Sequence, residues 1–349
     1  MSALARVRYG LLDRALGRGL LPDPLLVAGS RLGARARIRR ESAGGVEAQE
    51  HRLGELVETM RSGPVAETPA VANAQHYELP AEFFELFLGP RLKYSCGLWL
   101  DGVGDLAASE DAMLALTCER ALLRDGMNVL DLGCGWGSLS LWICERYPSA
   151  RVTAVSNSAS QRAWIEALSA RRGFSERLRV ITADVNTLEL EGGFDRVLSI
   201  EMFEHMRNWE ALLGRIAGWL NPDGRLFIHV FSHRRLAYEF AGTWAAERFF
   251  TAGRMPSHDL LLRFQRDLRV CESWAVAGTH YARTLEAWLE RLDANAERAG
   301  RVLAEQVGAG ARSVRALAAW RLFLLSTREM WGYRDGQEWM VSHYLLEPR

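Results

Sequence analysis

The chain has 349 residues, of which 48% are hydrophobic and 25% charged, and its formal net charge is zero. This composition is typical of globular proteins, and the balanced charge argues against nucleic acid as a partner. The five cysteines (Cys96, Cys118, Cys134, Cys144 and Cys271) form no CxxC or Cys/His pattern. We therefore expect no metal centre and a cytoplasmic location with reduced thiols. We also expect no membrane span and no signal peptide.

Residues 1–74 are predicted to form a helical N-terminal extension that ends in a linker at 63–72, where two prolines interrupt the helical pattern. The extension contains a basic stretch, which comprises Arg31, Arg35, Arg37, Arg39 and Arg40. Such a stretch usually forms a solvated helix face. The alternative is a peripheral contact with anionic lipid, because several arginines on one face attract phosphate.

Residues 75–349 are predicted to form the main domain. It opens with HYELPAEFFELFLG from His76, an amphipathic helix with Pro80 in its first turn. From Met127 onward, apolar strand segments and amphipathic helix segments alternate. Strands are expected at 127–133, 151–156, 178–184, 194–203 and 224–232, and helices at 137–148, 158–173 and 209–220. This order predicts an α/β fold with a mostly parallel sheet and helices on both faces.

The alternation is interrupted before the last expected strand, EWMVSHYLLEP at 338–348. The interruption, at about 236–335, contains helical segments at 285–300 and 314–332. Because an insertion in this place can cover the edge of the sheet, we interpret it as a substrate lid.

The clearest local motif is VLDLGCGWG, where an apolar strand containing Asp131 leads into Gly133, Gly135 and Gly137. Glycines let the backbone approach a ligand, and the N-terminus of the next helix attracts its carboxylate. A dinucleotide-binding fingerprint would place the third glycine one position later, and no lysine follows as in a P-loop. The pattern instead resembles that of class I (Rossmann-like) methyltransferases.

Polar residues after the next two strands extend this candidate cofactor site. Asn157 and Gln161 follow the second strand, and Asp184 and Val185 follow the third. An asparagine there can bind a ribose, and a carboxylate can accept from an adenine amine. The resemblance therefore implies S-adenosylmethionine as cofactor and S-adenosylhomocysteine as product.

The fourth strand is followed by EMFEHM, which places Glu201, Glu204 and His205 at the same end of the sheet as the glycine loop. These groups can accept a proton or stabilise a cationic amine, so they are our candidate catalytic residues. Two structural interpretations compete with this one. The residues could cap a helix, or the two carboxylates could share a proton in a structural network.

EMFEHM, HYELP, LKYSCGLW, VLDLGCGWG and VTAVSNSASQ together resemble the cyclopropane-fatty-acid synthase superfamily, and within it the coclaurine N-methyltransferase group. The resemblance extends from His76 to the C-terminus. It implies methyl transfer to the amine nitrogen of a small, partly aromatic substrate, with Glu201 and His205 around that nitrogen. It further implies substrate contacts from Tyr77, Glu78 and Tyr333.

The same resemblance supports an alternative, the methylation or cyclopropanation of unsaturated lipid acyl chains. Synthases of that branch hold bicarbonate with Cys, Glu, His and Tyr, and the matching residues here are Cys96, Glu204, His229 and Tyr281. Those synthases, however, have glycine at the position of Glu201, where the N-methyltransferases have glutamate. A third hypothesis is a non-catalytic protein that binds cofactor or a partner only, and the intact glycine loop and EMFEH motif argue against it.

Overall fold

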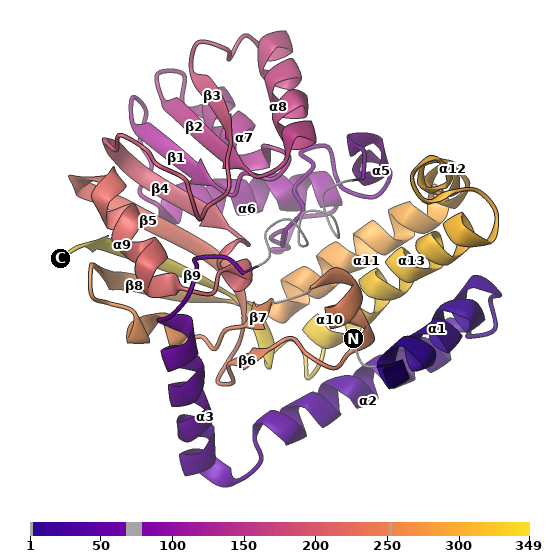
Figure 1. The fold of residues 1–349 in the computed structure, drawn as a ribbon. Helices are drawn as coiled ribbons and strands as arrows, with labels where there is room; N and C mark the ends of the chain where they lie inside the picture. The colour runs from indigo at the N-terminus through magenta and orange to yellow at the C-terminus, as the bar shows by residue number, and fades with distance from the viewer. Residues whose placement is uncertain (1–2, 68–78, 251–252) are drawn as a thin grey trace.

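The computed structural model describes residues 3–67, 79–250 and 253–349 and is built around a seven-stranded sheet of order β3-β2-β1-β4-β5-β9-β8 (Figure 1). Five strands are parallel: β1 (Asn128–Leu132), β2 (Arg151–Ser156), β3 (Leu178–Thr182), β4 (Phe194–Ile200) and β5 (Leu220–His233). The last strand, β9 (Trp339–Pro348), is antiparallel to both β5 and β8 (Leu268–Ala277). The predicted mostly parallel α/β sheet is confirmed.

Helices cover both faces of the sheet, as the alternating pattern predicted. One face packs against α6 (Leu106–Arg120), α7 (Ser138–Arg146) and α8 (Ala159–Arg172), and the other packs against α9 (Trp209–Trp219). Side-chain caps begin three of these helices, because Asp105, Ser158 and Asn208 accept hydrogen bonds from the first-turn N–H groups. The short helix α7 instead begins at Gly137, directly at the glycine loop.

Strand β8 was not predicted, although it lies within the range expected for the lid. Half of its side chains are exposed and its register shifts between Val270 and Glu272, so it lacks the regular alternation of a half-buried strand. The interruption therefore consists of two excursions separated by a sheet strand. The first contains β6 (Tyr238–Glu239), α10 (Trp244–Phe249), β7 (Arg254–Met255) and the 3-10 turn η2 (Leu260–Arg263), and the second contains α11 (Gly278–Ala294), α12 (Ala296–Val307) and α13 (Ala311–Trp331).

The described part of the N-terminal extension forms α1 (Ala3–Gly17), α2 (Asp23–Glu41) and α3 (Gly45–Met60). In Figure 1, α1 and α2 lie along the layer formed by α11 and α13. Asp23 accepts two hydrogen bonds from Arg321 at 2.6 and 2.7 Å, and Arg31 donates to Glu329 at 2.6 Å. The extension is therefore docked on helices from the C-terminal part of the chain.

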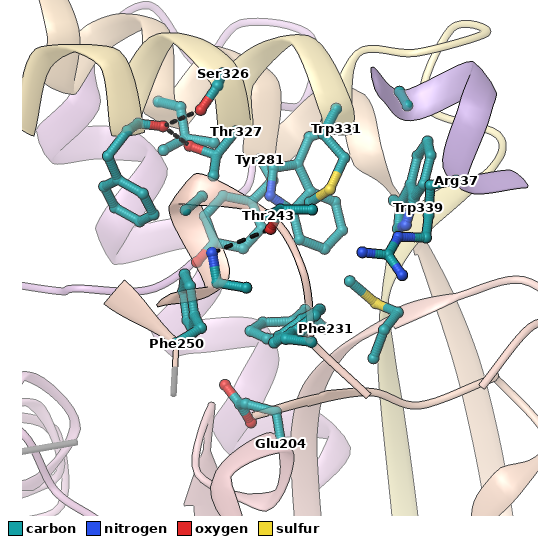
Figure 2. A pocket seen from close by; sticks show the side chains of 18 of the residues that line it. Arg37, Glu204, Phe231, Thr243, Phe250, Tyr281, Ser326, Thr327, Trp331 and Trp339 are labelled. Carbon is teal, nitrogen blue, oxygen red and sulfur yellow. Dashed lines mark hydrogen bonds between the residues drawn. The ribbon is translucent and has the colours of Figure 1, made fainter. Parts of the chain in front are cut away.

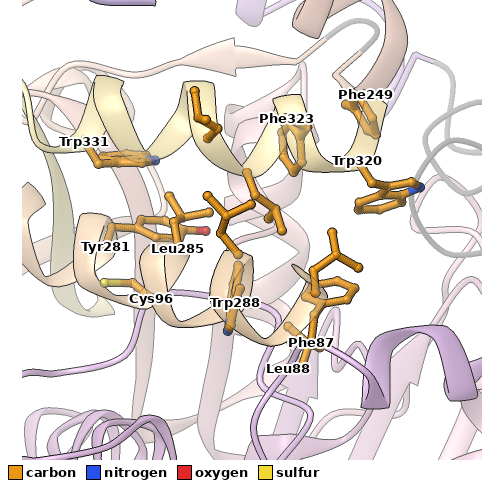
Figure 3. Packing of buried hydrophobic residues seen from close by; sticks show 14 of the residues in the cluster. Phe87, Leu88, Cys96, Phe249, Tyr281, Leu285, Trp288, Trp320, Phe323 and Trp331 are labelled. Carbon is orange, nitrogen blue, oxygen red and sulfur yellow. The ribbon is translucent and has the colours of Figure 1, made fainter. Parts of the chain in front are cut away.

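Aromatic side chains fill the space between α13, α11 and α5 (Ala81–Glu85), as Figure 3 shows. Tyr281 stacks on Trp331 with ring centroids 4.7 Å apart, and Phe249 stacks on Phe323 at 4.5 Å. Such pairs stabilise beyond the area they bury. This cluster gives the helical layer a rigid inner face beside the end of the sheet. No helix among the described residues is both long and apolar enough to cross a bilayer.

Candidate functional site

The glycine loop connects β1 to α7, and its three glycines serve different purposes. All have positive φ, at 85°, 53° and 79° for Gly133, Gly135 and Gly137. A Cβ at Gly133 would lie 2.9 Å from Met202 Sδ, and one at Gly137 would lie 2.7 Å from Ile165 Cγ1. A Cβ at Gly135 would meet no described atom within 4 Å. Gly133 and Gly137 are therefore required by packing, and Gly135 borders the open space that a ligand can occupy.

Asp131 supports this loop from within the sheet. Its buried carboxylate accepts a hydrogen bond from Ser140 Oγ, in the first turn of α7, at 2.6 Å. Burial raises the pKa of Asp131 to about 6, against the opposing effect of the Ser140 hydrogen bonds. This contact ties the end of β1 to the start of α7 and so fixes the shape of the loop.

The remaining cofactor candidates lie at the carboxyl ends of β2 and β3, beside the loop. Gln161 is buried, and its Oε1 accepts from Ser156 Oγ at 2.7 Å. Its Nε2 has no hydrogen-bond partner among the described residues. Since buried donors are normally satisfied, a polar ligand fits this position. The exposed Asn157 and Asp184 and the half-buried Val185 border the same end of the sheet.

Glu201 begins the second part of the site, where the chain leaves β4. The strand ends at Ile200, three residues earlier than predicted, because Glu201 turns the backbone at a φ of 49°. This left-handed conformation is unfavourable for a residue with a side chain, and such strain is concentrated at functional sites. The Glu201 N–H donates to the carbonyl of His229 at 2.8 Å, which fixes the turn to β5.

The Glu201 carboxylate receives hydrogen bonds from three separate segments. Cys96 N–H donates to Oε1 at 3.2 Å, Tyr281 Oη donates to Oε2 at 2.7 Å, and His229 Nε2 lies 3.2 Å from Oε1. The Glu201 side chain is only 9% exposed. The structure thus brings together three predicted residues, Cys96, His229 and Tyr281, around a fourth.

A buried lysine, which the sequence analysis did not single out, faces this carboxylate. Lys93 Nζ donates to Ser95 Oγ at 2.5 Å and to the Cys96 carbonyl at 2.7 Å. Burial raises the pKa of Glu201, and the Lys93 charge and the donated hydrogen bonds oppose that effect. A lysine within the otherwise apolar LKYSCGLWL was the available signal.

Glu204 and His205 lie in the 3-10 turn η1 (Phe203–His205) that follows. Glu204 is buried, and its Oε2 has no hydrogen-bond partner within the described ranges. Burial and the charge of Glu201 raise the pKa of Glu204 well above its ordinary value. Burial lowers the pKa of His205 to about 4, against the attraction of Glu201. Of the two carboxyl groups, Glu201 has the hydrogen-bond donors that stabilise a negative charge, and it lies beside an imidazole whose neutral form is favoured by burial.

Glu201, Glu204 and His205 line one end of a cavity of about 270 Å³. Figure 2 shows Glu204 below the rings of Phe231 and Phe250, with Tyr281 and Trp331 on the side of the helical layer. The volume is near the lower end of the range for small-molecule sites. The site is therefore an apolar chamber with a polar end that carries two carboxyl groups.

Helix α2 supplies one wall of this chamber, which the sequence did not reveal. Gly33, Ala34 and Arg37 line it, together with Ser30. Arg37 stacks on Tyr238 at 5.1 Å and donates to Glu41 at 3.0 Å. Neither interpretation of the basic stretch included this role.

Among the described residues, Tyr333 lies away from the chamber lining. Tyr333, expected in the substrate pocket, borders a separate surface groove, where it packs behind Trp339 with ring centroids 5.9 Å apart. Trp339 is the residue that lines the chamber. Tyr77 and Glu78 lie outside the described residues.

Comparisons with known proteins agree with this geometry. The family model described as mycolic acid cyclopropane synthetase matches residues 66–329. The chain belongs to this family. It is 38% identical to (S)-coclaurine N-methyltransferase of Thalictrum flavum subsp. glaucum over 96% of this chain and 95% of that protein. It is 30% identical to cyclopropane-fatty-acyl-phospholipid synthase of Escherichia coli K12, over 63% of this chain and 56% of that one.

The family includes a solved relative of nearly equal extent. The crystal structure of coclaurine N-methyltransferase bound to N-methylheliamine and S-adenosylhomocysteine superposes with a TM-score of 0.93 at 38% identity, covering 97% of this chain and 99% of that one. Our chain is an S-adenosylmethionine-dependent methyltransferase with the class I fold.

The loop geometry predicts that Gly135→Ala weakens S-adenosylhomocysteine binding by about tenfold or more, equivalent to about 1.4 kcal/mol. The added methyl group would occupy the open space beside the loop. Gly126→Ala is the matched control, because Gly126 also has positive φ (81°) and no described atom within 4 Å of its Cβ position. Both variants should lose about 1–2 kcal/mol of stability. Titration calorimetry showing equal affinity for both variants would contradict this assignment.

The wall formed by α2 predicts that Gly33→Leu raises KM for bulky substrates and leaves cofactor affinity unchanged. Gly33 lines the chamber, whereas Gly29, one turn earlier on the same helix, does not. Gly29→Leu is therefore the control, with the same gain in helix propensity. Steady-state kinetics over substrates of increasing size test this, and parallel behaviour of the two variants would remove α2 from the substrate wall.

Proposed function

We propose that the protein transfers a methyl group from S-adenosylmethionine to the amine nitrogen of a small, partly aromatic molecule. The observation that carries this proposal is the Glu201 carboxyl group, held by hydrogen bonds from Cys96 and Tyr281, at the end of an apolar chamber. A substrate with an apolar body and a cationic amine complements both features. Aromatic walls such as Phe231 and Trp331 also tolerate a cation.

The cofactor is proposed to bind at the carboxyl ends of β1, β2 and β3. Gly135 would allow its close approach, and Gln161 Nε2 would donate to it. Asn157, Asp184 and Val185 would contact its nucleoside part, and Asp131, Gly133 and Gly137 would maintain the loop. When bound, this cofactor supplies an electrophilic methyl group.

In the reaction, the chamber orients the substrate so that the nitrogen lone pair faces that methyl group. A carbon–nitrogen bond forms as the carbon–sulfur bond breaks, and positive charge moves onto the nitrogen. Glu201 stabilises this charge. A substrate that arrives as a cation must first lose a proton to expose this lone pair, and neutral His205, beside Glu201, is the candidate acceptor of that proton. Burial and the charge of Glu201 raise the pKa of Glu204, and the protonated form of Glu204 can donate a hydrogen bond into the chamber.

The relatives support an amine substrate. The (S)-coclaurine N-methyltransferase of Thalictrum flavum matches 96% of this chain, a span long enough to include the helix α2 that walls the chamber. The solved relative carries N-methylheliamine, an amine by its name. Which amine this protein accepts depends on the size of the chamber and on the space beside Gly33.

The lipid alternative is disfavoured by the position of Glu201. Cys96, His229 and Tyr281, three of the four residues that the resemblance assigned to bicarbonate, instead contact the Glu201 carboxylate. A carboxylate and a bicarbonate ion present similar oxygens, so the chain fills this anion site with its own side chain. The strained backbone and the buried charge also argue against a non-catalytic protein, in which neither would be useful.

We also propose a cytoplasmic location, supported by five cysteines that are all free, four of them buried. A peripheral lipid contact, if the basic stretch makes one, would use Arg35, Arg39 and Arg40, which are exposed. Arg31 and Arg37 are paired within the protein.

Because the Glu201 carboxylate occupies this anion site, we expect that an added anion can partly replace it. Glu201→Gly removes the carboxylate but suits the left-handed backbone, so the fold should be retained. N-methylation should fall by about a hundredfold to ten-thousandfold. Added bicarbonate or formate should restore part of it by binding to Cys96, His229 and Tyr281. Glu201→Gln is the control, because its amide keeps the space filled and should allow no rescue. Equal anion responses in the two variants would contradict the proposal.

The function itself is tested with radiolabelled methyl donor against a panel of cyclic secondary and tertiary amines and against vesicles of unsaturated phospholipid. We expect label in the amines, with rates independent of bicarbonate in the unmodified protein. Label in acyl chains that requires bicarbonate would support the lipid reaction. Cofactor binding without transfer to either class would support a binding protein.

A further inference from the structure

A row of buried side chains runs from the sheet surface to Glu201. His229 on β5 and His343 on β9 are directly opposite in the antiparallel ladder, and both are fully buried. Arg120 Nη1, from the last turn of α6, lies 2.8 Å from His343 Nδ1. His343 Nε2 lies 2.9 Å from His229 Nδ1, and His229 Nε2 lies 3.2 Å from Glu201 Oε1.

Arg120 determines the direction of every hydrogen bond in this row. A guanidinium only donates, so His343 Nδ1 must be its acceptor and carries no proton. His343 is then neutral with its proton on Nε2, which donates to His229 Nδ1. His229 is therefore neutral with its proton on Nε2, and it donates to Glu201.

We propose that Arg120 and His343 are positioning residues for methyl transfer, which act by fixing the tautomer of His229 so that it always presents a donor to Glu201. This role rests on the proposed function of Glu201. With the opposite tautomer, the His229 Nε2 lone pair would face the carboxylate and repel it. The carboxylate would then lose one of its three donors and would favour the protonated form.

The surroundings keep both imidazoles neutral. Burial is the main cause that lowers the pKa of His229 and of His343, and the charges of Lys93 and Arg120 lower both further. On the other side, Glu201 is faced by Lys93, Tyr281, Cys96 and His205 and by the carboxyl group of Glu204. Neither imidazole can therefore take up a proton in the neutral pH range.

The row also differs from a proton-transfer path. Such a path needs an acceptor at its outer end, and a guanidinium has no acceptor atom. Arg120 is partly exposed and stacks on Trp274 at 4.9 Å, so it remains solvated enough to stay charged. Every hydrogen bond in the row is consequently donated in one direction, from Arg120 toward Glu201. The substrate proton must therefore leave through the chamber.

The first test is the tautomeric state itself, measured on the unmodified protein without substrate by two-bond 15N–1H correlation of the imidazoles. We expect His229 and His343 to be protonated at Nε2 and unprotonated at Nδ1 across neutral pH. Because no turnover is required, this result is independent of the proposed reaction. A proton on Nδ1 of either ring would overturn the proposal.

The second test compares Arg120→Met with Arg146→Met. Arg146 also stacks on a tryptophan, Trp142, at 4.5 Å, but it lies outside the row. Arg120→Met should lower kcat/KM for the amine by about tenfold to a hundredfold, as expected for a lost charge-assisted hydrogen bond. It should also add an acidic limb to the pH–rate profile, because His343 Nδ1 becomes free to protonate. Arg146→Met should do neither.

The third test uses His343. His343→Gln offers an oxygen to Arg120 and an N–H to His229, so it should preserve both the His229 tautomer and most of the activity. His343→Leu, of similar volume, should release the tautomer and reduce activity as Arg120→Met does. If Arg120→Met and His343→Leu, like His343→Gln, retain the His229 tautomer and the pH profile of the unmodified protein, Arg120 and His343 have only a structural role.

Discussion

The arrangement of this site depends on one constraint, the burial of the Glu201 carboxylate. A charge withdrawn from water is costly unless donors replace the lost hydration. Here the donors come from the loop at Cys96, from β5 at His229 and from α11 at Tyr281. The sheet, the loop and the helical layer must therefore keep a fixed mutual position. Burial and the charge of Glu201 also raise the pKa of Glu204, and burial lowers the pKa of His205 to about 4.

The chamber next to this carboxylate joins two kinds of surface. The polar surface comes from the turn that follows β4, which places Glu201, Glu204 and His205 at the chamber. The helical layer and α2 provide apolar and aromatic walls. An amine with an apolar body matches this division, since its charge and its hydrocarbon meet opposite sides of one cavity. A neutral alkene would leave the charged end without a partner.

Much of this architecture could be predicted from local sequence. The alternation of strands and helices and the glycine loop are short-range patterns, and EMFEHM follows a recognisable buried strand. The rest depends on contacts between distant residues. Edge exposure and a register shift hide the strand pattern of β8, and the part played by α2 appears only when it docks on α13. The sequence also could not show that Trp339 lines the chamber, whereas Tyr333, whose ring contacts that of Trp339, borders a separate groove.

The docking of α2 also has a consequence for biosynthesis. Residues 129–205, which contain the glycine loop and EMFEH, form one contiguous stretch of the chain. The substrate chamber is discontinuous, because it needs both α2 and Trp339, and Arg31 of α2 meets Glu329 of α13 across 298 residues of sequence. Helices α1 and α2 are thus made first and placed last. The chamber in which an amine could be methylated is therefore complete only after nearly the whole chain has been synthesised.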